Sequence, residues 1–173
     1  MINFVKDIFL RHKLNKRLKI LELQAKDEIR SLDSMLVLTS NCEFDENIFF
    51  SLAKSLKIST KKITLIVISD KKLPQVKTKF GKIINLTKEK VGLFGTLDKE
   101  MHKYLDKKFD LLINYFSFSG IFPEYISASC SSKLRLGFYG VNHKISDIVF
   151  NINVKDKQAF LSESINYLNS FLK

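Results

Sequence analysis

The segment ITLIVIS at residues 63–69 decides the fold class, because it is a near-continuous run of β-branched and leucine side chains. Such a run is typical of a strand that is buried on both faces, inside a parallel sheet covered by helices. A second run, MLVLTS at residues 35–40, lies upstream. A predicted helix lies between the two runs, and its apolar face contains Ile48, Phe49, Leu52, Ala53 and Leu56. With Asp45 or a neighbour as its N-cap, this helix completes a strand, helix, strand unit with a right-handed crossover.

The same alternation continues towards the C-terminus. Further strands are predicted at residues 82–86, 109–116, 134–138 and 147–152. Helices are predicted at residues 97–108, 123–131 and from about 155 onwards. Gly92 and Gly95 bound a turn. The alternation predicts an α/β fold, in which residues 34–173 form a single Rossmann-like three-layer domain with a mostly parallel sheet.

A long helix is predicted ahead of this domain, in an N-terminal unit of residues 1–33. Residues 2–32 contain neither Gly nor Pro, and their apolar residues recur at helical steps, namely Leu10, Leu14, Leu18, Leu21, Ala25 and Ile29. The other faces are basic and carry Lys6, Arg11, Lys13, Lys16, Arg17 and Lys19. Two interpretations stay open. Either these residues form a solvated face of an amphipathic helix, or they form an arm that docks on RNA or makes a peripheral contact with membrane headgroups.

The composition is that of a globular chain, with 45% apolar and 27% charged residues among 173. It excludes a disordered or collagen-like chain. Cys42 and Cys130 lie far apart, which argues against a disulfide framework and against a CxxC site. No apolar run approaches the roughly 18 residues of a membrane span. We expect a cytoplasmic protein without a transmembrane segment.

Motifs for catalysis and for cofactor binding are missing. Residues 39–45, which follow the first predicted strand, contain no glycine and so cannot form the G-x-G-x-x-G turn of a dinucleotide site. No P-loop or closely spaced Cys/His cluster occurs either. His143 is followed by Ser146 and Asp147, but neighbours in one turn seldom face each other as a triad does. We expect no catalytic residues, no metal and no cofactor.

Polar side chains follow two of the buried strands, at the edge where parallel sheets usually bind ligands. They include Thr39, Ser40, Asn41 and Ser117. Residues 39–41 either form an anion-binding nest or cap the next helix. A small phosphorylated or sugar ligand at this edge is the alternative function, that of an enzyme or enzyme remnant.

Positive charge is concentrated in the middle of the chain. The formal net charge is +11, and residues 54–90 contain eleven lysines but only two acidic residues. Together with the N-terminal helix they supply the candidate polyanion contacts Arg11, Lys13, Lys16, Arg17, Lys61, Lys62, Lys71, Lys72, Lys77, Lys79 and Lys82. Lysine reads phosphate backbones rather than base edges, so any RNA contact is expected to be salt-sensitive and weakly sequence-specific. Codon bias in an AT-rich genome accounts equally well for the lysine excess.

Two stretches resemble a known enzyme family. Residues 109–114, FDLLIN, and 133–138, KLRLGF, are similar to consecutive strands in the amino-terminal half of heptosyltransferase-type glycosyltransferases. Those enzymes hold their nucleotide sugar in a second domain that has no counterpart in this sequence. The resemblance therefore implies a sheet and no donor chemistry.

The whole chain more closely resembles a family of short, uncharacterised bacterial proteins. The shared features are the basic N-terminal helix, GTLDKE at residues 95–100, FDLLINYF at 109–116 and KLRLGF at 133–138. This resemblance implies a single Rossmann-like domain and no particular activity. The expectation is a non-catalytic binding protein whose lysine-rich surface contacts RNA, a ribosomal surface or an acidic protein.

Overall fold

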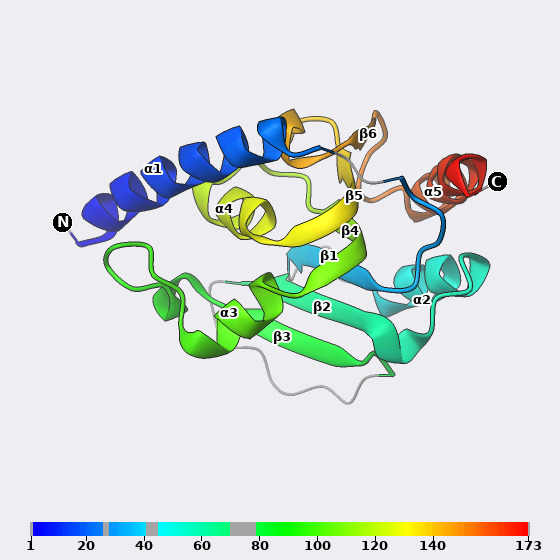
Figure 1. The fold of residues 1–173 in the computed structure, drawn as a ribbon, viewed down its shortest axis with the longest axis horizontal. Helices are drawn as coiled ribbons and strands as arrows, with labels where there is room; N and C mark the ends of the chain where they lie inside the picture. The colour runs from blue at the N-terminus through cyan, green and yellow to red at the C-terminus, as the bar shows by residue number, and fades with distance from the viewer. Residues whose placement is uncertain (1, 26–27, 41–44, 70–78, 173) are drawn as a thin grey trace.

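A computed structural model describes residues 2–25, 28–40, 45–69 and 79–172. Its sheet has six strands in the order β3-β2-β1-β4-β5-β6, and every neighbouring pair is parallel. The strands are β1 (Met35–Ser40), β2 (Ile63–Ile68), β3 (Lys82–Leu86), β4 (Lys108–Tyr115), β5 (Ser131–Phe138) and β6 (Ile148–Phe150). The helices are α1 (Ile2–Leu23), α2 (Glu46–Ser55), α3 (Lys99–Leu105), α4 (Ile121–Ser129) and α5 (Lys157–Phe171). Helices cover both faces of the sheet, which confirms the predicted α/β Rossmann-like architecture (Figure 1).

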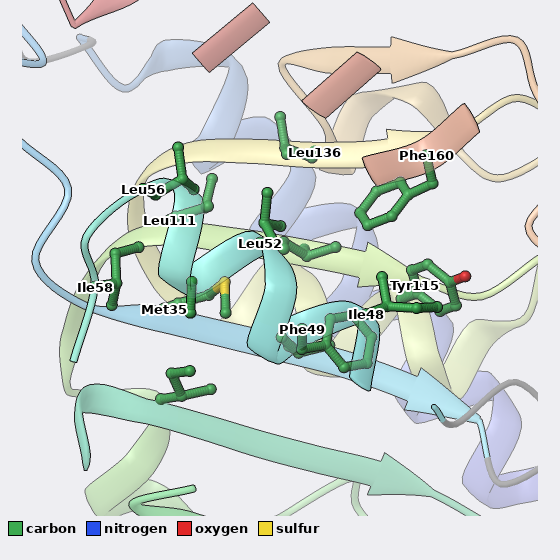
Figure 2. Packing of buried hydrophobic residues seen from close by; sticks show 14 of the residues in the cluster. Met35, Ile48, Phe49, Leu52, Leu56, Ile58, Leu111, Tyr115, Leu136 and Phe160 are labelled. Atoms are coloured by element: carbon green, nitrogen blue, oxygen red, sulfur yellow. The ribbon is translucent and has the colours of Figure 1, made fainter. Parts of the chain in front are cut away.

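One face of the sheet is covered by α2 and α5. All six residues of both β1 and β2 are buried, as the apolar runs predicted. The side chains of Phe49 and Leu52 on α2 pack against the strands (Figure 2). Tyr115 ends β4 within an aromatic cluster, and its hydroxyl donates a hydrogen bond of 2.7 Å to the carbonyl of Val154. This bond ties the segment before α5 to the centre of the sheet.

The opposite face is covered by α1, α3 and α4. Leu10, Leu14 and Leu18 of α1 are buried, which confirms the predicted apolar stripe. The helix lies alongside α4 (Figure 1). Lys6 was predicted on the basic faces outside this stripe, but it is buried at the start of the stripe and donates to the carbonyl of Lys88. Its ammonium therefore joins α1 to the segment that follows β3.

The N-terminal helix ends nine residues earlier than predicted, at Leu23 instead of about residue 32. The prediction was wrong because it extended one helical face to Ala25 and Ile29. Ile29 and Leu32 pack with the core on the α2 and α5 side of the sheet, whereas Leu18 packs on the other side. A straight helix cannot reach both faces, so the chain leaves the helix to pass around the sheet.

Smaller differences concern the ends of elements. The helix predicted at residues 97–108 is shorter, because Asp98 caps its start at Lys99 and Lys108 pairs with Ser131 in the sheet. The strand predicted at 134–138 begins earlier, at Ser131. Within the described ranges, no helix is long and apolar enough to cross a bilayer.

Candidate functional site

The strand order reverses between β1 and β4, and this point is where doubly wound sheets usually bind ligands. Thr39 lies opposite Tyr115 in the register of these strands, Ser40 ends β1, and Ser117 follows β4. The structure therefore brings three of the four predicted ligand-binding residues to one rim. Asn41, the fourth, lies outside the described residues.

The hydroxyl groups at this rim are unequally accessible. Thr39 is fully buried, and its hydroxyl donates to the carbonyl of Ser40 at 3.2 Å. Ser40 itself is only 8% exposed. Of these three side chains, Ser117 alone is exposed to solvent.

The N-termini of the two helices nearest the rim already hold carboxylates of the chain itself. Asp45 caps α2 by accepting a hydrogen bond of 3.0 Å from the amide of Asn47, and it also pairs with Lys157. The hydrogen bond from Lys157 holds the pKa of Asp45 below its ordinary value, against the opposing effect of burial. The predicted cap at Asp45 is confirmed. The helix begins at Glu46, five residues beyond the proposed nest at residues 39–41.

Glu124 fills the equivalent position at α4. Its side chain is buried, and one carboxylate oxygen accepts from the amide of Gly120 at 3.1 Å and from the hydroxyl of Ser119 at 2.5 Å. The other oxygen accepts from the side-chain amide of Asn142 at 3.1 Å. A bound phosphate would need these same donors. Sequence reasoning missed this role, although an acidic residue in the first turn of a predicted helix was a signal for it.

The amino ends of β2 and β3 carry a cluster of lysines that we call the lysine edge. It consists of Lys54, Lys57, Lys61, Lys62, Lys79 and Lys82, all exposed. The two strands are held together there, because the amide of Gly81 donates to the carbonyl of Thr60 at 3.0 Å and Lys82 pairs with Thr64. A side chain at position 81 would place its Cβ 2.0 Å from the carbonyl oxygen of Lys61, so only glycine permits this close approach.

Five of the six lysines of the lysine edge differ from other lysines of the chain in their ion pairing. Lys88, Lys133, Lys144 and Lys157 each pair with a carboxylate. Among the described residues, no carboxylate pairs with Lys54, Lys57, Lys61, Lys62 or Lys79. The ammonium of Lys82 lies 5.4 Å from the centroid of the Tyr104 ring. The five other lysines therefore present positive charge that no carboxylate of the described residues compensates.

The remaining predicted polyanion contacts lie elsewhere. Arg11, Lys13, Lys16 and Arg17 belong to α1, which packs on α4 and on the 3-10 helix His143–Ile145, away from the amino ends of β2 and β3. Lys13 donates to the carbonyl of Gly95 at 3.1 Å. The structure does not join these residues to the lysine edge. Lys71, Lys72 and Lys77 fall outside the described residues.

The polar groups near His143 are directed to other partners. Ser146 accepts from the side-chain amide of Asn114 at 3.1 Å, and Asp147 accepts from the backbone amide of Arg135 at 2.9 Å. The imidazole of His143 is exposed. These contacts fasten the segment before β6 onto the sheet and assemble no nucleophile and base.

A hollow of about 200 Å³ lies beside this segment. It is lined by Leu21, Glu22, Gln24, Ala25, Lys108, Ser132, Lys133, Arg135, His143, Lys144, Ser146 and Asp147. Its cations are largely engaged, since Lys144 pairs with Glu22 and Arg135 donates to the carbonyls of the last turn of α4. Burial lowers the pKa of Arg135 from its ordinary value. In the described part of the chain, no group of His, Cys, Asp and Glu side chains is placed to hold a metal ion.

Comparison with known protein families matches residues 6–171 to a family of unknown function, DUF6913. The chain belongs to this family. No curated protein and no solved structure matches the sequence. Membership of DUF6913 agrees with the predicted resemblance to an uncharacterised family and supplies no activity. The heptosyltransferase resemblance and a bacterial origin stay predictions.

Proposed function

We propose that this protein is a non-catalytic binding protein that contacts the sugar-phosphate backbone of RNA through the lysine edge. The observation that supports the proposal is the set of exposed lysines at the amino ends of β2 and β3, five of which lack carboxylate partners among the described residues. Such ammonium groups attract phosphates without first breaking an internal ion pair. The RNA at the surface of a ribosome is one candidate partner, because it exposes such a sugar-phosphate backbone.

The physical chemistry of the lysine edge favours backbone contact over sequence readout. Lysine is a compact, flexible point charge and does not present the rigid fork with which arginine recognises base edges. Each phosphate that a lysine neutralises releases counterions, so affinity falls as salt rises. Four to six contacts with a single strand correspond to a slope of roughly −3 to −4 in a plot of log affinity against log salt.

The test measures binding of a fluorescent single-stranded RNA over a salt series. Between about 50 and about 200 mM salt, the affinity is expected to fall roughly 60- to 250-fold. The double substitution Lys61→Glu with Lys62→Glu is expected to weaken binding at least tenfold and to make the slope shallower by about 1.4, because two contacts are removed. A flat salt response, or no binding at low salt, overturns the proposal.

Lys99 and Lys155 supply the matched control. Both are exposed and lie at helix starts near the carboxyl ends of the strands, opposite the lysine edge. Lys99→Glu with Lys155→Glu changes the net charge by the same amount and is expected to leave the slope within about 0.5 of the wild-type value. Equal losses of RNA affinity in both double variants would indicate that binding depends on the net charge of the protein and not on the lysine edge. Direct binding of poly-glutamate at equal charge, with no binding of RNA, points to an acidic protein as the partner.

A second candidate function is binding of a small phosphorylated or sugar ligand at the carboxyl ends of β1 and β4. The reversal of strand order at this point and the exposed Ser117 favour it. The buried Glu124 and the Asp45 cap oppose it, because both helix N-termini are occupied by carboxylates. A thermal-shift screen with nucleotides and sugar phosphates tests it. A rise in melting temperature that Ser117→Tyr abolishes supports the rim site, and no shift with any compound rejects it.

A further inference from the structure

Apolar side chains protrude at the end of the molecule where α1 begins. They are Phe4 (71% exposed), Ile8 (53%), Phe9 (37%), Leu93 (43%) and Phe94 (58%), and we call them the apolar tip. Phe4, Ile8 and Phe9 come from the first turns of α1, and the other two come from the loop of residues 92–95 beside them (Figure 1). Large apolar side chains that are exposed at one end of a molecule mark a surface that something else covers.

The loop is held firmly against the helix. The rings of Phe9 and Phe94 meet edge to face with centroids 5.1 Å apart. The amide of Gly95 donates to the carbonyl of Gly92 at 2.9 Å, which closes a turn, and Lys13 donates to the carbonyl of Gly95. The two parts of the apolar tip therefore form one structural unit.

The residues at the turn are unusual for their position. Leu93 and Phe94 occupy the two central positions between Gly92 and Gly95, where exposed turns favour Gly, Pro, Asn, Asp or Ser. Both side chains are directed outwards instead of into the core. Large apolar side chains that protrude from a tight turn can insert into the apolar part of a lipid bilayer. They form no concave pocket for a folded partner protein.

Positive charge lies beside the apolar tip along the same helix. Residues 2–23 contain six Lys or Arg residues but only Asp7 and Glu22 as acids. Asp7 is neutralised by Lys88 and Glu22 by Lys144. Arg11, Lys16, Arg17 and Lys19 are exposed. Apolar side chains flanked by cations are complementary to the surface of a bilayer that contains anionic lipids.

We propose that the apolar tip inserts into the headgroup region of an anionic lipid bilayer, with the cations of α1 facing the lipid phosphates. A second copy of the chain fits this surface less well. The five partly exposed side chains offer on the order of 500 Å², since an entire aromatic side chain buries about 150–250 Å². A stable interface needs about 800 Å² from each partner. The inference is independent of the RNA proposal, which concerns the other end of the strands.

The experiment uses the absence of tryptophan from the sequence. In Phe94→Trp the new indole is the single tryptophan and reports directly on the polarity around position 94. Vesicles of phosphatidylcholine with about 30% phosphatidylglycerol are expected to shift its emission to the blue and to allow quenching by brominated acyl chains. Vesicles of phosphatidylcholine alone are expected to bind at least tenfold more weakly, because they lack the anionic charge.

Variants in the wild-type background separate the possible occupants. Leu93→Ser with Phe94→Ser, in an exposed turn, is expected to reduce vesicle co-sedimentation at least tenfold, roughly the effect of removing two partly inserted side chains. Tyr139→Ser is the control, because Tyr139 is 76% exposed on another part of the surface and its loss is expected to change nothing. An indole emission spectrum of Phe94→Trp that anionic vesicles leave unshifted overturns the proposal. So does a dimer in sedimentation velocity that the double variant abolishes.

Discussion

Lys57 adopts a left-handed backbone conformation, with φ of 58°, directly after α2. Its amide donates to the carbonyl of Lys54, and the next amide, of Ile58, donates to that of Ala53 at 2.8 Å, which is the pattern of a glycine-type helix end. A residue with a Cβ is strained there. We predict that Lys57→Gly raises the free energy of unfolding by about 0.5–1 kcal/mol. Urea denaturation measures the change.

Lys54→Gly is the matched control for this prediction, because it removes the same charge from a helical position. It is expected to lower the free energy of unfolding by about 0.5–1 kcal/mol, since glycine is unfavourable within a helix. Equal effects of the two substitutions would contradict the assignment of strain to Lys57. Comparing the two variants also separates backbone effects from the loss of one lysine of the lysine edge.

Asp110 anchors the chain that precedes β1. Its carboxylate accepts from the amide and the hydroxyl of Ser34 at 3.0 and 2.9 Å, and it pairs with Lys133 at 2.6 Å. Burial opposes ionisation, but the hydrogen bonds from Lys133 and Ser34 prevail and hold the pKa of Asp110 below its ordinary value. A carboxylate with a lowered pKa stabilises the fold above the pKa of the unfolded state, and this stabilisation is lost as the pH falls through the folded value.

We therefore predict a pH-dependent effect of Asp110→Asn. At neutral pH the variant is expected to lose about 2 kcal/mol of unfolding free energy, because charged hydrogen bonds contribute about 1.5–3 kcal/mol each and Asn retains part of the geometry. The difference is expected to shrink below about pH 4, where Asp begins to protonate in the unfolded chain. Urea denaturation of both proteins across this range measures it. Parallel stability curves would refute the role given to the charge.

At the scale of the element, a carboxylate lies at the start of each of the four described helices that begin near the carboxyl ends of the strands. Asp45, Asp98, Glu124 and Asp156 accept hydrogen bonds at the starts of α2, α3, α4 and α5. Each negative charge lies at the positive end of a helix dipole and satisfies an amide that the helix leaves free. The lysine edge lies at the opposite edge of the sheet, where α2 ends.

Glu124 is the most buried of these four carboxylates, and its removal tests the arrangement. We predict that Glu124→Gln lowers the free energy of unfolding by about 1–2 kcal/mol, because the buried site loses its charge and part of its hydrogen bonding. Glu163→Gln, in the middle of α5, is the control and is expected to change it by less than about 0.5 kcal/mol. Thermal or urea unfolding measures both. A neutral Glu124→Gln would show that the carboxylate is dispensable.

At the scale of the whole molecule, the two proposed surfaces lie at different places. The lysine edge lies at the amino ends of β2 and β3, and the apolar tip lies beside the start of α1 and the segment after β3. We predict that Lys61→Glu with Lys62→Glu weakens RNA binding at least tenfold and retains at least half of vesicle binding. Leu93→Ser with Phe94→Ser is predicted to do the reverse. Loss of both activities in either variant would mean that one surface serves both ligands.

The sequence was informative where one short segment carries the whole signal. The buried runs at residues 35–40 and 63–69, the stripe through Leu10 and Leu18, and the Asp45 cap all follow from local periodicity or local hydrogen bonding. The end of α1 could not be predicted in this way. Its helical pattern continues to Ile29, and the helix stops because Ile29 packs on the opposite face of the sheet.

The same distinction between local and long-range information applies to the candidate surfaces. The charge count of residues 54–90 already indicated a cationic region, since charge is a property of composition. Which lysines gather, and which have carboxylate partners, depends on strands and helices that meet in space. The contact of Phe94 with Phe9 and the hydrogen bond from Asn142 to Glu124 depend on long-range packing too, because each joins segments that are distant in the sequence. Local pattern thus determined the elements and the sign of the charge, and long-range packing decided which side chains are left for a partner.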